Sequence, residues 1–163
     1  TVVIYFGCYI FWIIGYLYNA AMDKRHCYRF LMADWLAKAV CFICYVVYPT
    51  TNTRPEIVGS DIWAQLMRFL YSMDAADNLF PSIHCLVSWL CYIGIRGNKK
   101  VPQWIRTTFC ICAIAVFIST LTTKQHVIYD VVAGVALVEV TYRVSKLIVK
   151  KAVKKGKSNT EEA

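Results

Sequence analysis

The sequence predicts an all-α protein built as a polytopic bundle of transmembrane helices. Hydrophobic residues make up 58% of the 163 residues, and the mean hydropathy of +0.47 is high for a soluble domain. Only 17% of the residues are charged, and they gather between long apolar segments. These three observations together indicate a membrane protein.

Five apolar segments follow one another along the chain. About 20 helical residues cross the hydrocarbon core of a bilayer, because an α-helix rises about 1.5 Å per residue. The expected spans are residues 2–22, 30–48, 81–95, 102–121 and 127–149. The chain begins at Thr1 without an initiator Met or a cleavable signal pattern, so a sixth helix upstream stays an open alternative.

Two charged residues interrupt the second span. Asp34 precedes Lys38 by one helical turn, the order that favours an ion pair on one helix face. We therefore expect the two charges to neutralise each other inside the bundle.

The segment between the second and third spans, residues 49–80, contains one amphipathic stretch. Residues 60–73 place apolar side chains on one helical face and polar side chains on the other. This pattern predicts an interfacial helix in the outer loop. A loop helix packed on the bundle is the alternative.

The basic residues predict an orientation. Of the 18 Lys and Arg residues, 14 fall on one side of the predicted membrane and 3 on the other, and Lys38 lies within a span. The positive-inside rule assigns the basic side to the cytoplasm. The net charge of +8 is then a topology signal, with anionic lipid rather than nucleic acid as the counter-charge.

The division of the chain follows from the same pattern. We expect residues 1–149 to form a single membrane-embedded domain of an integral protein of the cell membrane. Residues 150–163 form a basic tail, predicted to be cytoplasmic and frayed. The oligomeric state is left open.

Sequence signals for a cofactor are missing. The chain has no glycine-rich phosphate loop and no dinucleotide fingerprint. Cys41 and Cys44 have metal-ligand spacing, but they lie within an apolar span without a histidine or a second pair. We therefore expect neither a bound metal nor a cofactor.

Two histidines stand at the start of apolar segments, on the side poor in basic residues. His126 and Asp130 are four apart and share one helix face, so the carboxylate can hold one ring nitrogen and leave the other free as a nucleophile. His84 begins another helix and can protonate a leaving oxygen. These three residues are the candidate catalytic set.

Phosphate-binding residues accompany the histidines on that side. Ser82 lies at a helix start, where unpaired N–H groups favour an anion. Arg54 can grip phosphate oxygens with two parallel hydrogen bonds, and Lys124 adds a point charge. The predicted chemistry is phosphoryl transfer at the extracytoplasmic face.

Three short segments resemble the signature motifs of the type-2 phosphatidate phosphatase (PAP2) superfamily, which are Thr53-Arg54-Pro55, Pro81-Ser82-Ile83-His84 and Ser119-x6-His126-x3-Asp130. The resemblance implies a helical-bundle core, a metal-free reaction and a phosphohistidine intermediate. It makes His126 the nucleophile, Asp130 its orienting acid and His84 the acid for the leaving group. Its implied phosphate-binding residues are Arg54, Ser82 and Ser119.

Two positions depart from these motifs. Val47 stands where the family usually has a Lys, and Thr120 stands where it usually has an Arg. A pocket with fewer cations suits a phosphodiester, which carries one negative charge, better than a phosphomonoester, which carries between one and two.

Three functions stay open on the sequence. The first is a phosphatase acting on a lipid phosphate monoester or pyrophosphate. The second is a lipid phosphotransferase, resembling the sphingomyelin and inositol-phosphorylceramide synthases, and the third is a non-catalytic lipid-binding protein. A separate alternative is that Asp74 and Asp77 hold a Mg²⁺ that replaces the missing cations.

Overall fold

The computed structural model describes residues 1–161, which form six helices and no strand. The helices are α1 (Val2–Ala20), α2 (Lys24–Val47), α3 (Ile62–Met73), α4 (Ile83–Arg96), α5 (Gln103–Thr122) and α6 (Ile128–Glu161). The predicted all-α class is confirmed, and α3 coincides with the amphipathic helix expected in the outer loop.

The long helices have the character of membrane spans. By length and composition α1, α2 and α5 can each cross a bilayer, and α4 is a shorter apolar helix. Their outward faces carry large apolar side chains: Ile10, Leu17, Phe42 and Val46 are all more than half exposed. Large apolar faces of this kind are unfavourable in water and favourable against the acyl chains of lipids. The fold is therefore that of a helical membrane bundle.

Three helices begin at a side chain that caps them. Asp23, Asp61 and Ser82 each precede a helix and accept a hydrogen bond from a backbone N–H of its first turn. These residue types are favoured at this position because they satisfy donors that have no partner within the helix. The first residues of α2, α3 and α4 are thus determined locally by the sequence.

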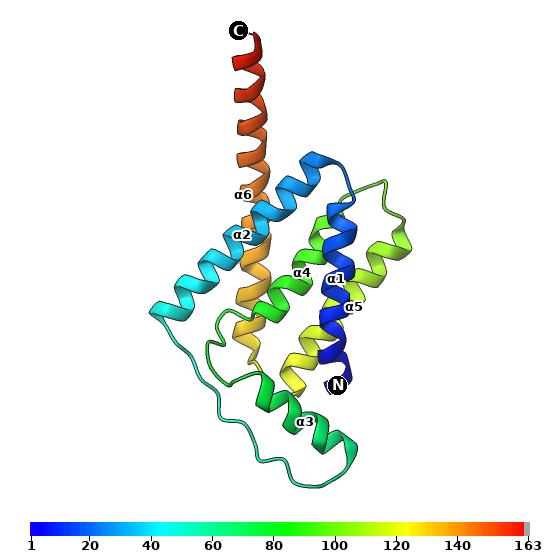
Figure 1. The fold of residues 1–163 in the computed structure, drawn as a ribbon, viewed down its shortest axis with the longest axis vertical. Helices are drawn as coiled ribbons and strands as arrows, with labels where there is room; N and C mark the ends of the chain where they lie inside the picture. The colour runs from blue at the N-terminus through cyan, green and yellow to red at the C-terminus, as the bar shows by residue number, and fades with distance from the viewer. Residues whose placement is uncertain (162–163) are drawn as a thin grey trace.

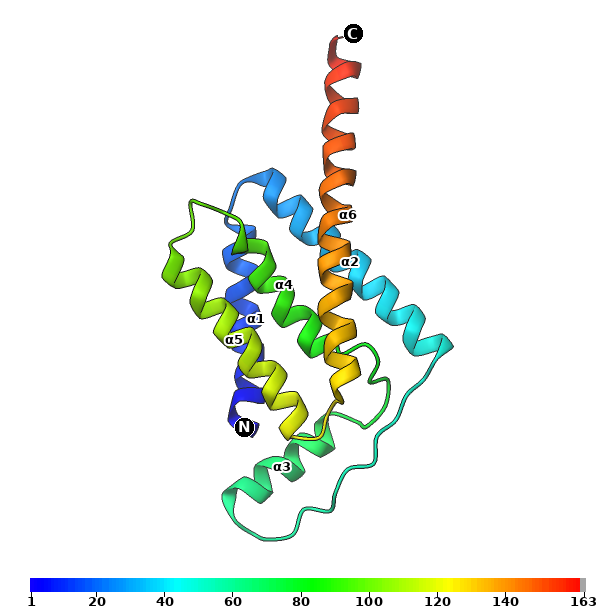
Figure 2. The ribbon, with the colours of Figure 1, turned by 180° about the vertical axis from the view of Figure 1, so that it is seen from behind.

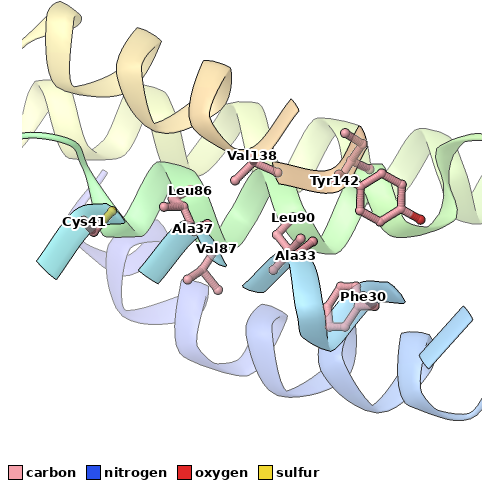
Figure 3. Packing of buried hydrophobic residues seen from close by; sticks show 10 residues of the cluster. Phe30, Ala33, Ala37, Cys41, Leu86, Val87, Leu90, Val138 and Tyr142 are labelled. Carbon is pink, nitrogen blue, oxygen red and sulfur yellow. The ribbon is translucent and has the colours of Figure 1, made fainter. Parts of the chain in front are cut away.

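The core lies where α4 packs between the other long helices, and α4 contacts α1, α2, α5 and α6. Its largest cluster joins α2, α4 and α6 (Figure 3) and contains Phe30, Ala33, Ala37, Cys41, Leu86, Val87, Leu90, Ile93, Val138 and Tyr142. Ala33 and Ala37 lie one turn apart on α2, and small residues at that spacing allow two helices to approach closely.

The ion pair predicted between Asp34 and Lys38 is present in the structure. Lys38 Nζ lies 2.8 Å from Asp34 Oδ2, as the spacing predicted. The hydroxyl of Tyr16 also donates to Asp34 Oδ1 at 2.7 Å. The buried carboxylate is therefore both charge-paired and hydrogen-bonded, which offsets the cost of removing it from water.

Several helices begin or end at the same end of the bundle (Figures 1 and 2). The starts of α1, α4 and α6 and the end of α5 lie there, with α3 beside them. The opposite end holds the end of α1, the start of α2 and the loop between α4 and α5. All the candidate catalytic and phosphate-binding residues belong to the first end, which we call the site end.

The last helix is longer than expected. The sequence predicted a span ending near Val149, and α6 continues past it to Glu161. The residues that follow Val149 are Lys150, Lys151 and Ala152, which have high helix propensity. Helix propensity thus extends α6 past the end of the apolar pattern.

Candidate active site

The loop between α5 and α6 positions His126. The backbone N–H groups of Gln125 and His126 both donate to the carbonyl of Thr120, at 3.0 and 3.2 Å. Lys124 adopts a φ of 56°, a left-handed conformation that turns the chain sharply between the two helices. His126 is therefore held just before the first turn of α6.

The structure brings His126 and Asp130 together. His126 Nδ1 lies 3.3 Å from Asp130 Oδ2, and the same oxygen accepts a hydrogen bond from the N–H of Val127 at 3.0 Å. The exposed fractions of His126 and Asp130 are 7% and 4%. Because Nδ1 faces the carboxylate, Nε2 is the ring nitrogen left for chemistry.

His84 lies opposite His126, in the first turn of α4. The centroids of the two imidazole rings are 5.8 Å apart, and His84 is as buried as His126. The two histidines come from segments about forty residues apart in the sequence, yet their rings lie side by side in the structure.

A backbone contact between α4 and α6 sets this separation. The N–H of Ser82 donates to the carbonyl of Asp130 at 3.1 Å. One turn further along α6, a Cβ added to Gly134 would lie 2.7 Å from the carbonyl oxygen of Ser82. Only glycine permits this close approach, so Gly134 fixes how near the two helix starts lie.

Tyr5 and Asp74 complete the surroundings of His84, a contact that the sequence analysis did not predict. The Tyr5 hydroxyl lies 2.8 Å from His84 Nε2 and also donates to the carboxylate of Asp74. Tyr5 is fully buried where α1 packs on α3, and the Trp12 ring lies 5.4 Å from His84. A tyrosine within an apolar span carries no signal in a single sequence.

Arg54 is held by the loop that follows α3 and by the loop that carries His126. Its Nη1 donates to the carbonyl of Asp74 at 2.5 Å, and its Nη2 donates to the carbonyl of Ala75 at 3.1 Å and to the side-chain oxygen of Gln125. The guanidinium also stacks over Tyr71, 4.6 Å from the ring centroid. Gln125 directly precedes His126, and this position is the one feature of the sequence that indicates a role for Gln125 in the site.

Part of the Arg54 guanidinium is still available. An arginine has five N–H donors, and the three contacts just described use three of them. The Nε–H is buried and has no hydrogen-bond partner among the described residues. Arg54 is therefore oriented by protein groups and keeps donors for an anion.

A cavity of about 830 Å³ joins Arg54, Lys124 and His126. The rest of its lining consists of Asn52, Thr53, Pro55, Leu121, Val127, Ile128 and Tyr129. Its cationic side chains are Arg54 and Lys124, and Val127, Ile128 and Tyr129 are exposed apolar residues beside them. The cavity thus offers positive charge next to an apolar wall, which suits a lipid phosphate.

The two serines lie outside this cavity lining. The Ser82 hydroxyl oxygen accepts a hydrogen bond from the N–H of Cys85 at 3.3 Å and caps α4. Ser119 donates to the carbonyl of Thr1 at 2.9 Å, and both serines are fully buried. The structure therefore places Ser82 beside His84 and keeps Ser119 in a contact between α5 and the start of α1.

The two departures from the family motifs supply no cation. Val47 is 76% exposed near the end of α2. Thr120 is buried, donates to the carbonyl of Phe117 at 2.9 Å and lies 3.6 Å from the Cys85 sulfur. No group of three or more His, Cys, Asp or Glu residues that could hold a metal ion occurs in the described part of the chain.

Comparison with known proteins identifies one family. A family model described as the PAP2 superfamily matches residues 2–144, which include every candidate residue from Tyr5 to Asp130. Searches of curated proteins and of solved structures gave no match.

Proposed function

The chain belongs to the PAP2 superfamily, and from this we propose that it is a membrane lipid phosphatase that hydrolyses a lipid phosphate monoester or pyrophosphate. Family membership supports a phosphatase or phosphotransferase activity in general. The observation that carries the specific proposal is the pairing of His126 with Asp130, opposite His84 and beside a cavity that contains Arg54.

In the first step, His126 Nε2 attacks the phosphorus atom. A P–N bond forms, the P–O bond to the lipid breaks, and His84 gives a proton to the leaving oxygen. Asp130 accepts from Nδ1–H and stabilises the positive charge that develops on the His126 ring.

In the second step, a water molecule attacks the phosphorus of the phosphohistidine. His84, now neutral, takes a proton from that water, the P–N bond breaks, and inorganic phosphate leaves. The cycle ends with His126 free and His84 protonated again, so no group is consumed.

The protein must keep His84 protonated for the first step. The Tyr5 hydroxyl donates to Asp74, so its oxygen accepts the N–H of His84 Nε2. This relay places the negative charge of Asp74 one hydrogen bond away from the imidazolium. Asp74 and Tyr5 therefore act as positioning residues for the general acid.

Positive groups neutralise the phosphoryl oxygens. We assign this role to the remaining donors of Arg54, to Lys124 and to the N-terminus of α4 at Ser82, whose unpaired backbone groups favour an anion. Ser119 keeps its predicted role only if its contact with Thr1 opens.

A phosphotransferase is the second candidate, and one observation favours it. The cavity is lined by two cationic side chains, and Val47 and Thr120 add none. A site with this charge accommodates the single charge of a phosphodiester readily. A lipid or polyol hydroxyl would then replace water in the second step.

The orientation is part of the proposal. We place the protein in the cell membrane with the site end outside the cytoplasm and the C-terminal tail inside. The support is the distribution of basic residues, since most of them belong to segments at the end opposite the site.

A single assay separates the candidate functions. The purified chain, reconstituted in vesicles, is incubated with lipid monoesters, pyrophosphates and diesters, with and without diacylglycerol or ceramide. Free phosphate released without an acceptor supports the phosphatase, and headgroup transfer that requires an acceptor supports the transferase. Absence of both products across the panel would refute a catalytic function.

A further inference from the structure

A second polar cavity lies at the end of the bundle opposite the site. It has a volume of about 500 Å³ and is formed by α2, α4, α6 and the loop after α4. Its lining includes five Lys or Arg residues and one acidic residue, which are Arg29, Arg96, Lys99, Arg143, Lys146 and Glu139. We call this cavity the basic pocket.

The single carboxylate does not neutralise the basic pocket. Glu139 binds Arg96 through two hydrogen bonds, at 2.6 and 3.1 Å, and lies 3.6 Å from Arg143. Arg29, Lys99 and Lys146 form no ion pair with any carboxylate in the described part of the chain. The pocket therefore has an excess of positive charge.

Arg29 is held in place before any ligand arrives. Its guanidinium carbon lies 3.8 Å from the centroid of the Tyr142 ring, and its Nη2 donates to the carbonyl of Tyr142 at 3.3 Å. The Nε–H is buried and has no hydrogen-bond partner among the described residues. A guanidinium fixed by stacking loses little entropy when it binds an oxyanion, and it can offer two parallel donors.

The basic pocket continues into a smaller one. A cavity of about 320 Å³ shares His26, Arg29 and Lys146 with it and adds two basic residues, Arg25 and Lys150, and one acidic residue, Asp23. The basic surface therefore follows α2 and α6 along the end of the bundle, at the level where the headgroups of a bilayer lie if the helices span it.

We propose that the basic pocket binds the phosphate group of an anionic ligand, either the headgroup of an anionic phospholipid or a soluble phosphate ester. Basic pockets between transmembrane helices are suited to anionic headgroups. In this pocket Arg29 is partly buried, and the other four cationic side chains are exposed at the rim. Arg29 supplies the planar donors and Lys146 a point charge. This proposal does not depend on the catalytic one, since the two sites lie at opposite ends of the bundle.

The test uses the full chain in phosphatidylcholine nanodiscs with and without phosphatidylglycerol. Native mass spectrometry then counts the anionic lipids that stay bound. The test variant is Arg29→Gln with Lys146→Gln. The matched control is Lys24→Gln with Lys151→Gln, because these exposed lysines carry the same total charge and line neither basic cavity.

We expect the test variant to bind phosphatidylglycerol roughly tenfold more weakly and the control to bind it as the parent does. A parallel arm measures binding of glycerol phosphate and inorganic phosphate by calorimetry. Binding that depends on Arg29 and Lys146 in the lipid arm alone assigns a lipid, and in the soluble arm alone it assigns a free ester.

Equal loss in the test and control pairs would overturn the proposal, because it would show general charge attraction. Absence of variant-dependent binding in both arms would overturn it as well. If the double variant does not fold, Arg29→Lys replaces it, since this change keeps the charge and removes only the planar donors.

Discussion

The Tyr5 hydroxyl lies 2.8 Å from His84 Nε2 and donates a hydrogen bond to the carboxylate of Asp74. The three residues come from α1, α4 and the segment after α3. This relationship connects the proposed general acid to a negative charge and makes α1 part of the candidate active site.

Replacing Tyr5 with Phe should lower kcat about tenfold on a lipid phosphate, because His84 loses the group that positions it and connects it to Asp74. An aryl phosphate, whose leaving oxygen needs no proton, should lose much less. The measurement is the ratio of the two rates. Tyr9→Phe is the control, since the Tyr9 ring lies 6.5 Å from His84 without a hydrogen bond to it. Equal losses on both substrates would assign Tyr5 a purely structural role.

Replacing His126 with Ala should abolish turnover and leave the detergent-solubilised yield unchanged. His126 lines the cavity and precedes the first residue of α6, so we expect its replacement to leave the helices in place. The double variant with His84→Ala should be no worse than the single one, since residues acting as a unit are not additive. A His126→Ala protein within a few-fold of the parent rate would contradict the nucleophile assignment.

Replacing Gly134 with Ala should reduce the free energy of unfolding by about 1–3 kcal/mol, because the new Cβ meets the Ser82 carbonyl at 2.7 Å and the helices must move apart. Activity should fall with it, since the shift also separates the two histidines. Thermal denaturation and the lipid assay measure the two effects. Gly7→Ala is the matched control, as a Cβ there meets nothing within 4 Å. Equal stability of the two variants would show that α4 and α6 tolerate a wider spacing.

The reaction should proceed in excess chelator. We propose that Arg54, Lys124 and the start of α4 supply the positive charge that neutralises the phosphate. The carboxylate of Asp74 accepts a hydrogen bond from Tyr5. Assays with chelator, followed by addition of Mg²⁺, Mn²⁺ or Ca²⁺, measure the dependence. Loss of activity with rescue by one of these ions would favour the alternative in which Asp74 and Asp77 hold a metal.

We expect the C-terminal tail to lie in the cytoplasm. A reporter that works only in the cytoplasm should therefore be active when it is fused after Lys157. The expectation rests on the excess of basic residues at the end opposite the site. A signal from a reporter that works only outside the cytoplasm would invert the proposed orientation and the compartment of the reaction.

The sequence predicted what depends on local spacing. The apolar segments predicted the long helices. The four-residue interval predicted the contact between His126 and Asp130, because one helical turn brings such residues onto one face. The same reasoning gave the Asp34–Lys38 pair. In each case the partners lie in one helix or at its start.

The sequence could not predict contacts between distant segments. Tyr5 lies 79 positions before His84, and Arg54 lies 71 positions before Gln125, so no periodicity relates them. The motif that contains Ser119 predicts a role at the phosphate, and the sequence does not show that its hydroxyl donates to the carbonyl of Thr1. Tertiary packing decides these contacts, and only the folded bundle shows them.

The contact of Gly134 with the Ser82 carbonyl has a consequence for how such a protein can diversify. Backbone atoms, not side chains, fix the distance between the two histidines. The cavity is instead bordered by residues of the outer loop and by the exposed apolar residues at the start of α6. With the function proposed above, substitutions along that border would select a different lipid while the proposed reacting centre stays unchanged, so new substrate preferences would evolve without a change in the chemistry.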